Sequence, residues 1–298
     1  MKNRKKDILE YLTGYAFVLP VLIFILFFIA YPIIESLALS FFKWKGIGDW
    51  NFVGIKNYIK MFTEDRFFYT SIKNSILFSI GTTFGTILIG FILAVLIDLK
   101  IHFWKLYRFI FFLPISLSVA VVALLWSRIF DPYGLVNSLL GVLHLEELQR
   151  IWLGDTRLAM GVIIFVTVWQ YSGFPMIFFL AGMQNIDEQL YEAAKIDGAS
   201  TIRRIVSITL PALKNVFSVI IMIQLIFSFK VFDIVWIMTM GGPAGATDVL
   251  GTRLYSEAFR SGQFGYASVI AVIMFSIALI FSIIYVRISG YQKTVIES

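Results

Sequence analysis

Long apolar runs dominate the pattern of hydrophobic and polar positions along this chain of 298 residues. A helix needs about 20 apolar residues to cross a hydrocarbon core of about 30 Å. Six runs reach about this length, and they predict membrane-spanning helices over residues 15–34, 75–97, 109–126, 158–181, 216–240 and 265–286. The runs are continuously apolar and do not alternate, which excludes a closed β-barrel. We therefore predict an all-α protein, a polytopic bundle of six transmembrane helices that forms one domain over residues 1–298.

The first run follows a basic tail with four cations in its first six residues, an arrangement that also opens secretory signal peptides. The triplet Ser36-Leu37-Ala38 would supply small residues for cleavage. However, the core of a signal peptide has about 7–15 apolar residues, and this run is longer. We therefore expect a retained helix.

Composition narrows the function classes. Hydrophobic residues make up 59% of the chain and charged residues 15%, whereas a soluble domain carries about 25% charged residues. The net charge of +6 lies in tails and loops without a basic face, so nucleic acid is not an expected partner. Cys is absent, and the two His, His102 and His144, lie far apart. We expect no catalytic residue, no metal site and no cofactor on this chain.

Lys and Arg near the helix ends predict the orientation, because cytoplasmic loops are enriched in them. The basic tail places the N-terminus in the cytoplasm, and six spans return the C-terminus, with Arg287 and Lys293, to the same side. Six cations in or beside the first external segment run against the rule, but the first helix usually dominates. The loops 98–108 and 182–214 are then cytoplasmic, and the external segments are 43–72, 131–156 and 241–264.

The external segment 131–156 opens with a turn and continues as an amphipathic stretch rich in Leu. Two interpretations stay open. The stretch forms a short helix on the membrane surface, or it is a packed connector between two spans.

The cytoplasmic loop 182–214 contains a short helix with good end signals. Asp187 predicts an N-cap, Glu188 adds a negative charge in the first turn, and Gly198 predicts the C-terminal stop. A second short helix can begin at Ser200 or the next residue, and it must bend or end near Pro211. An ordinary amphipathic loop would also fit this composition.

The residues of this loop carry a resemblance. Glu192-Ala193-Ala194, then Gly198, then Ile208-Thr209-Leu210-Pro211 resembles the EAA signature of ABC-importer permeases. Further stretches are similar to the sugar-permease branch of that family, namely residues 130–137, 180–186, 232–243 and 264–268. The resemblance covers nearly the whole chain and is greatest to the first of two permeases in oligosaccharide and glycerol-phosphate type importers.

The resemblance implies a type I importer permease fold in a bacterial cytoplasmic membrane. It implies four further components: a second homologous permease, two copies of an ATP-binding subunit that carry ATP-Mg, and an extracytoplasmic solute-binding protein. The EAA loop would dock on the ATP-binding subunit, with Glu192 facing a basic residue there and Gly198 allowing the close turn. The expected coupling residues are Glu192, Ala193, Ala194, Asp197, Gly198 and Pro211. The chain has no Walker A pattern, so ATP hydrolysis is expected on the partner and not on this chain.

Polar groups inside apolar spans are costly in lipid and are therefore candidates for the substrate path. Aromatic rings beside an amide suit a sugar, which offers apolar ring faces and hydroxyls. Lys230 and Asp233 lie three residues apart, so on a helix they share a face and can pair. They can also only snorkel or pin the helix to its neighbours. The candidates are Trp169, Gln170, Tyr171, Gln224, Lys230 and Asp233.

Two other functions would also suit a polytopic membrane protein. A secondary transporter of a small polar solute is the alternative, but it needs intramembrane carboxylates for ion coupling, and Asp233 is the only acid in the predicted spans. A membrane-embedded enzyme would need a cluster of His, Asp or Ser at one depth, and the sequence shows none.

Overall fold

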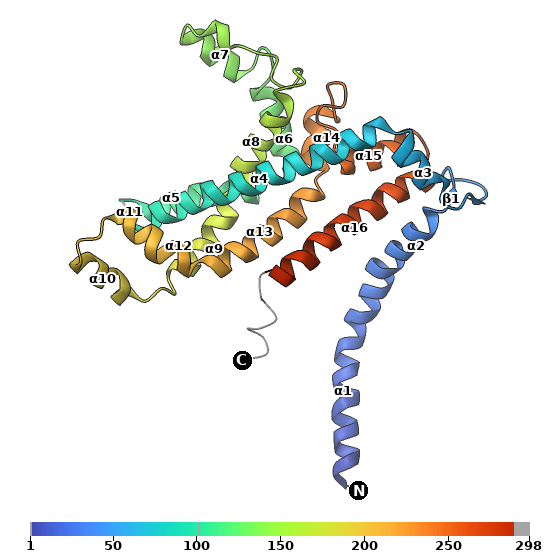
Figure 1. Cartoon of the computed structure of the whole chain (residues 1–298), viewed down its shortest axis with the longest axis horizontal. Coiled ribbons are helices and arrows are strands. Elements are labelled where there is room, and N and C mark those ends of the chain that lie inside the picture. The colour runs from blue at the N-terminus through green and yellow to red at the C-terminus, as the bar shows by residue number, and fades with distance from the viewer. Residues whose placement is uncertain (1, 101, 289–298) are drawn as a thin grey trace. The chain divides into compact units, whose positions relative to one another are not determined.

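The computed structural model describes residues 2–100 and 102–288, and these residues form helices almost throughout (Figure 1). The predicted all-α class is confirmed. The described chain divides into two compact units, one of residues up to Glu64 with Leu254–Ile273, the other of Asp65–Arg253 with the residues from Met274. The single domain over residues 1–298 stays a prediction. The predicted cytoplasmic C-terminus, with Lys293, lies outside the described residues.

The first unit begins with a long apolar helix. It comprises α1 (Lys2–Ile25), the π-helical turn η1 (Leu26–Ala30) and α2 (Tyr31–Leu39). Gly14–Leu39 is long and apolar enough to cross a membrane, and none of its most apolar window is buried inside the protein. Exposed apolar side chains on all sides of a helix suit lipid and not water. The predicted first span, 15–34, lies within this helix.

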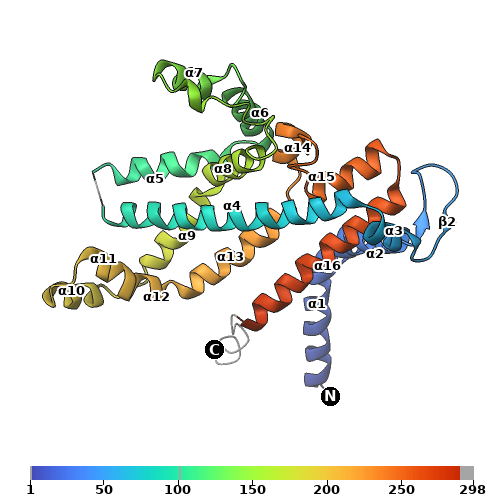
Figure 2. The same cartoon turned by 45° about the horizontal axis from the view of Figure 1, so that its top comes forward.

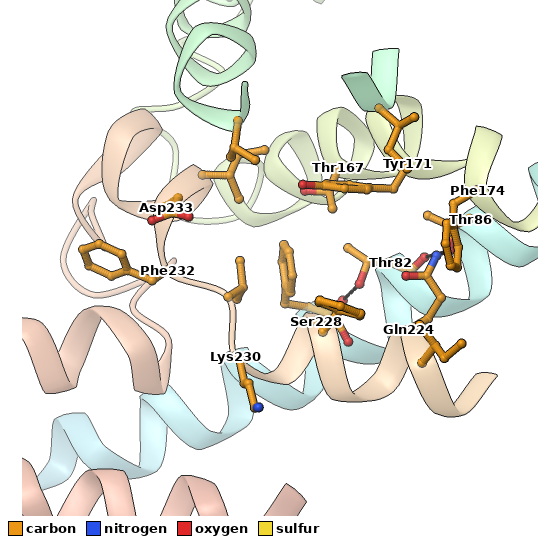
Figure 3. A pocket seen from close by; sticks show the side chains of 17 residues that line it. Thr82, Thr86, Thr167, Tyr171, Phe174, Gln224, Ser228, Lys230, Phe232 and Asp233 are labelled. Carbon is orange, nitrogen blue, oxygen red and sulfur yellow. Dashed lines mark hydrogen bonds between the residues drawn. The ribbon is translucent and has the colours of Figure 1, made fainter. Parts of the chain in front are cut away.

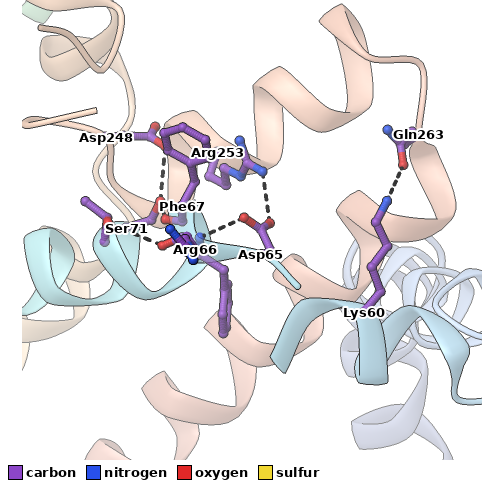
Figure 4. Close-up of polar contacts among 10 residues, drawn as sticks. Lys60, Asp65, Arg66, Phe67, Ser71, Asp248, Arg253 and Gln263 are labelled. Atoms are coloured by element: carbon purple, nitrogen blue, oxygen red, sulfur yellow. Dashed lines mark hydrogen bonds and ion pairs between the residues drawn. The ribbon is translucent and has the colours of Figure 1, made fainter. Parts of the chain in front are cut away.

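The rest of the first unit is a small cap that α16 (Phe264–Ile288) enters with its first residues. Strand β1 (Phe42–Lys43) pairs antiparallel with β2 (Asn51–Phe52), and α3 (Lys56–Thr63) and η5 (Ser256–Arg260) complete the cap. A Cβ on Gly265 would collide with the Phe42 carbonyl oxygen, so only glycine permits this approach. Lys60 Nζ donates to Gln263 Oε1 at 3.3 Å (Figure 4).

Helix α4 (Arg66–Asp98), 33 residues long, is the central element of the second unit. Helices α8 (Ala159–Tyr171), α9 (Gly173–Met183) and α13 (Lys214–Phe229) pack along it (Figures 1 and 2). A Cβ on Gly85 would lie 2.5 Å from Val168 Cγ2, so the small residue brings α8 close. The predicted second span, 75–97, lies inside α4.

The third predicted run, 109–126, is not one continuous helix. It is divided between α5 (Trp104–Phe112) with η2 (Leu113–Ser116) and α6 (Val119–Ile129), whose axes differ by 99°. Pro114 lacks a backbone N–H, and Leu117 is extended, so the helical ladder ends here. The fourth run bends by 42° between α8 and α9, where Pro175 stands in the first turn of α9.

The fifth predicted run, 216–240, is also interrupted. Helix α13 ends at Phe229, and α14 (Asp233–Thr239) begins after a break of three residues. Before α13 the chain forms α10 (Glu188–Ile196), α11 (Thr201–Arg204), the π-helical turn η4 (Ile205–Thr209) and α12 (Leu210–Ala212). Three described helices are long and apolar enough to cross a membrane, or up to six spans if each bent pair counts as one.

The segment 131–156 folds around one buried amide. Asn137 Nδ2 donates to the carbonyls of Pro132 and Arg150 at 3.0 and 2.9 Å, and Trp152 Nε1 donates to Asn137 Oδ1 at 2.8 Å. The segment contains α7 (Leu135–Val142) and the turn η3 (Glu146–Leu148). It is therefore a hydrogen-bonded connector that contains a short helix, and the position of that helix on the membrane surface stays a prediction.

Polar side chains at the N-terminal end of α4 contact α15 (Leu250–Tyr255) and the segment that joins it to α14. We call these contacts the α4 clamp (Figure 4). Arg253 Nη2 lies 2.9 Å from Asp65 Oδ2. Asn74 Nδ2 donates to the carbonyls of Gly245 and Asp248 at 3.1 and 2.9 Å, and Ser71 Oγ donates to Asp248 Oδ2 at 3.1 Å. The clamp orients the N-terminal end of α4, and α4 lines the cavity described next.

Candidate functional site

A cavity of about 400 Å³ lies among α4, α8, α13 and α14 in the second unit (Figure 3). Hydroxyl groups, one amide and several aromatic rings dominate its lining, and two charged side chains, Lys230 and Asp233, join them. The hydroxyls come from α4, α8 and α13, so three long helices contribute polar groups to one space. The polar and aromatic lining residues are Phe78, Thr82, Thr86, Thr167, Tyr171, Phe174, Gln224, Phe227, Ser228 and Phe232.

Two hydrogen bonds join α4 and α13 across the cavity wall. Gln224 Nε2 donates to Thr86 Oγ1 at 2.9 Å, and the hydroxyls of Ser79 and Ser228 lie 2.7 Å apart. Thr86 in turn donates to the Thr82 carbonyl at 2.7 Å, so its hydroxyl is held by one bond on each side. The Gln224 amide is therefore positioned before any substrate arrives.

Four of the six candidates for the substrate path line this cavity, namely Tyr171, Gln224, Lys230 and Asp233. Trp169 and Gln170 do not. Successive helical residues are rotated by about 100°, so neighbours of Tyr171 on α8 face elsewhere. Trp169 packs its ring against Trp126 at 5.2 Å, and the fully buried Gln170 donates from Nε2 to the Leu117 carbonyl at 3.2 Å.

The predicted pairing of Lys230 and Asp233 on one helix face does not form. Because α13 ends before Lys230 and α14 begins at Asp233, the two residues are not on a common helix. Their side chains point apart in Figure 3, both are exposed, and no ion pair joins them in the described part of the chain. Each charge is free to meet solvent or substrate at the break.

The Ser and Thr hydroxyl groups of the cavity were not among the candidates from the sequence. Ser and Thr are common in apolar helices, where they donate to carbonyls of the preceding turn, so single ones carry little information. Their spacing does carry information. Ser75, Ser79, Thr82 and Thr86 recur every three or four residues and so follow one face of α4. The lining residues Phe78, Phe174, Phe227 and Phe232 were not among the candidates, because no local feature shows which of the 30 Phe face a cavity.

The loop 182–214, which the sequence analysis predicts to be cytoplasmic, has the predicted local geometry. Asp187 caps α10, with Oδ1 accepting from Gln189 N at 2.9 Å, and Ser200 caps α11 by accepting from Arg203 N at 3.3 Å. Gly198 has φ +75°, a conformation in which glycine is favoured. The expected N-cap and the expected C-terminal glycine are both confirmed. Pro211 lies in the short helix α12, where the chain turns into α13.

The remaining coupling candidates lie on or beside α10. Glu192, Ala193 and Asp197 are exposed and Ala194 is half-buried. Two apolar neighbours were not singled out from the sequence. Ile196 is 87% exposed and Ile202 is 75% exposed. A glutamate beside small and apolar exposed side chains is a surface that another protein can cover.

Both regions are typical of a multi-pass membrane permease, with a cavity among apolar helices that carries a few polar groups, and a capped loop. The family model described as binding-protein-dependent transport system inner membrane component matches residues 86–290. The chain is 39% identical over 277 residues to the probable ABC transporter permease protein YurN of Bacillus subtilis, an alignment that covers 92% of this chain and 94% of the relative.

Two further comparisons agree. The chain is 34% identical over 287 residues to the multiple sugar-binding transport system permease protein MsmF of Streptococcus mutans, covering 95% of this chain and 97% of the relative. It is similar in structure to a chain of a bacterial alginate ABC transporter solved in complex with its alginate pentasaccharide-bound periplasmic protein. The TM-score is 0.84 at 25% identity, with 95% of this chain and 96% of that chain covered.

The chain belongs to the family of inner membrane components of binding-protein-dependent transport systems. It is a membrane permease subunit of an ABC importer, and its fold is that of such permeases. The alternative of a secondary transporter is therefore set aside. Among the described residues, no group of three or more His, Cys, Asp or Glu side chains is placed to hold a metal ion.

Proposed function

We propose that this permease imports a sugar or an oligosaccharide and forms half of the translocation path. The observation that carries this proposal is the chemistry of the cavity. Its lining offers hydroxyls and the Gln224 amide for hydrogen bonds, and rings such as Phe174 and Phe227 for apolar faces. A sugar presents both kinds of surface. The relatives named above for sugars and for alginate support the same substrate class.

Within this path Tyr171 and Gln224 contact the sugar, while Lys230 and Asp233 meet it at the break between α13 and α14. Trp169 and Gln170 act as positioning residues behind the cavity wall. The ring system of Trp169 packs against Trp126, and the Gln170 amide donates to the Leu117 carbonyl.

The loop from α10 to α12 couples transport to a separate ATPase. Two copies of an ATP-binding subunit hydrolyse ATP-Mg, and one receives α10 in a cleft where Glu192 meets a basic residue. The exposure of Glu192, Ile196 and Ile202 supports this role, because apolar side chains around one charge are typical of a surface that is buried in an assembly. Gly198 permits the close turn that follows.

The assembly includes a second homologous permease, this chain being the first of the pair, and an extracytoplasmic solute-binding protein. The alginate transporter, solved with its periplasmic protein bound, supports the last of these partners. Both termini and residues 182–214 face the cytoplasm.

Labelling of single cysteines tests this orientation, and the absence of native Cys makes the background clean. Cys at Ser138 on α7 should react with an impermeant thiol reagent in whole cells, whereas Cys at Gln189 on α10 should react only after lysis. Gln189 is chosen because its side chain caps no helix. The opposite labelling pattern would reject the orientation.

Uptake by the complete complex in proteoliposomes tests the function. Import of the sugar carried by the associated binding protein should require ATP at the nucleotide-binding side and the binding protein outside. Replacement Gln224→Leu should lower initial uptake about tenfold, the cost of one lost hydrogen bond with partly unpaired groups left behind, while basal ATP hydrolysis persists. Uptake driven by an ion gradient without ATP would overturn the proposal.

A further inference from the structure

A second cavity, of about 520 Å³, lies at the C-terminal end of α4. Its walls come from the end of α4 with the residues that follow, the start of α5, the end of α9, and the loop from α10 to η4. Apart from tyrosine, six ionisable side chains line this cavity. We call it the basic cavity, because four of the six are cationic. These six are Asp98, Lys100, Arg108, Glu188, Lys195 and Arg204.

The charges of the basic cavity are not paired with one another. In residues 2–100 and 102–288, none of these six side chains forms an ion pair. Of the six, Arg204 has the clearest need for a further hydrogen-bond partner. Its Nη2 donates to Thr201 Oγ1 at 3.1 Å, and its Nε is buried with no acceptor among the described residues. A buried donor without an acceptor costs about 1–3 kcal/mol, so the Arg204 guanidinium is underpaired and an anion at its other N–H groups would stabilise it.

The surrounding groups indicate which anion fits. A guanidinium binds the oxygens of a phosphate with parallel N–H donors, and a lysine adds a compact charge. Trp104 and Tyr191 line the same space, and apolar side chains of Leu180 and Met183 form part of its wall. Such a lining accepts a phosphate together with the glycerol and the first carbons of a lipid. Its volume is within the range of about 300–1,000 Å³ that is usual for ligand sites.

We propose that the basic cavity binds a phosphate group, supplied by the headgroup of an anionic phospholipid. A soluble phosphate ester is the other source of the same chemistry. The choice of the lipid rests on the proposed orientation, which puts the cavity at the cytoplasmic leaflet, where anionic lipids gather and Trp is common. A phosphate held between Arg108 of α5 and Arg204 of α11 ties the loop from α10 to α12 to the helix bundle.

Lipid retention by the purified complete complex tests this site. Native mass spectrometry titrates the complex with phosphatidylglycerol or with phosphatidylcholine, for the wild type, Arg204→Gln and Arg203→Gln. Arg203 is a matched control, because it is the exposed neighbour of Arg204 on α11 and does not line the cavity. Arg108→Gln is the second cavity variant and guards against a folding defect specific to Arg204.

The wild type and Arg203→Gln should prefer phosphatidylglycerol, and Arg204→Gln and Arg108→Gln should each weaken its binding about tenfold or more. Addition of glycerol 3-phosphate or inorganic phosphate decides the source. Displacement of the lipid assigns the site to soluble esters, and resistance assigns it to the membrane.

Equal affinity for both lipids would overturn the site, because it would show no selection for an anionic headgroup. Equal weakening by Arg203→Gln and Arg204→Gln would overturn it in favour of general surface charge. Transport is not part of the measurement, so failure of the proposed import function would leave its outcome unchanged.

Discussion

The loop from α10 to α12 and the cavity among α4, α8, α13 and α14 are held together by different kinds of contact. In the loop, Asp187 caps a residue two positions away and Ser200 caps one three positions away. In the cavity, Gln224 reaches Thr86 across 138 positions, and Ser79 reaches Ser228 across 149. A short segment can therefore specify its own shape, whereas a cavity wall exists only after distant helices have packed. The first is readable from local sequence and the second is not.

The same difference suits the two proposed roles. A loop with local caps and an exposed face keeps its shape while its surroundings change. A loop that transmits the movement of a partner subunit needs this property. A cavity built from long-range hydrogen bonds changes whenever its helices move against one another. Rocking of those helices would therefore alter the affinity for substrate without unfolding any element.

The largest effect is expected where the loop meets its partner. Glu192→Lys reverses an exposed charge and should lower uptake at least about thirtyfold, since truncating one partner of a buried charge pair costs about 2–5 kcal/mol. Stimulation of ATP hydrolysis by the loaded binding protein should be lost. Both activities are measured in proteoliposomes.

Glu147→Lys is the matched charge reversal, at an exposed site on the segment 131–156. It should stay within about twofold of the wild type, as surface substitutions usually do. Unchanged uptake with Glu192→Lys would show that the loop is only a connector.

A smaller effect is expected for the turn at Gly198. No atom lies within 4 Å of a Cβ placed there, so a side chain meets only the backbone strain at φ +75°. Gly198→Val should lower uptake about tenfold, because a left-handed conformation costs about 1–2 kcal/mol for an ordinary residue. Gly198→Asn, which tolerates that conformation, should retain most of the uptake. Equal loss in both variants would point to a steric role and not to the backbone.

The smallest effect is expected inside the cavity. Thr86→Val removes the acceptor of Gln224 and should lower uptake about fivefold, from a loss of about 1 kcal/mol. Thr83 is the control three residues away, since its buried Oγ1 has no partner among the described residues and it does not line the cavity. Thr83→Val should therefore be neutral in uptake and in thermal stability. If the two variants behave alike, the Gln224–Thr86 bond has no functional weight.

The sequence predicted what depends on neighbours in the chain. Apolar runs indicated the helices, and Asp187 and Gly198 indicated the ends of α10. Pro114 lies inside the predicted run 109–126 and is a local signal for the sharp bend found there. The bend was not predicted, because the run is continuously hydrophobic. Lys230–Phe232 contains neither Pro nor Gly, so no local signal separates α13 from α14.

Rotation about the helix axis decides which of the candidates line the cavity. Trp169 and Gln170 adjoin Tyr171 in the chain, but only packing decides which face of α8 is turned to the cavity. The hydroxyls of α4 would have been found by applying helical periodicity to Ser and Thr as well as to apolar residues.

The break between α13 and α14 has a consequence for hydration. Backbone groups that leave a helical ladder are tolerated at membrane depth only where water or protein meets them. Lys230, Val231 and Phe232 line the cavity, so we expect water in the cavity to meet this break before any solute arrives. An incoming sugar then exchanges one hydrogen-bonding environment for another and does not enter a dry interior. Because entry and departure both involve only this exchange, the path can hold its cargo loosely, which rapid passage requires.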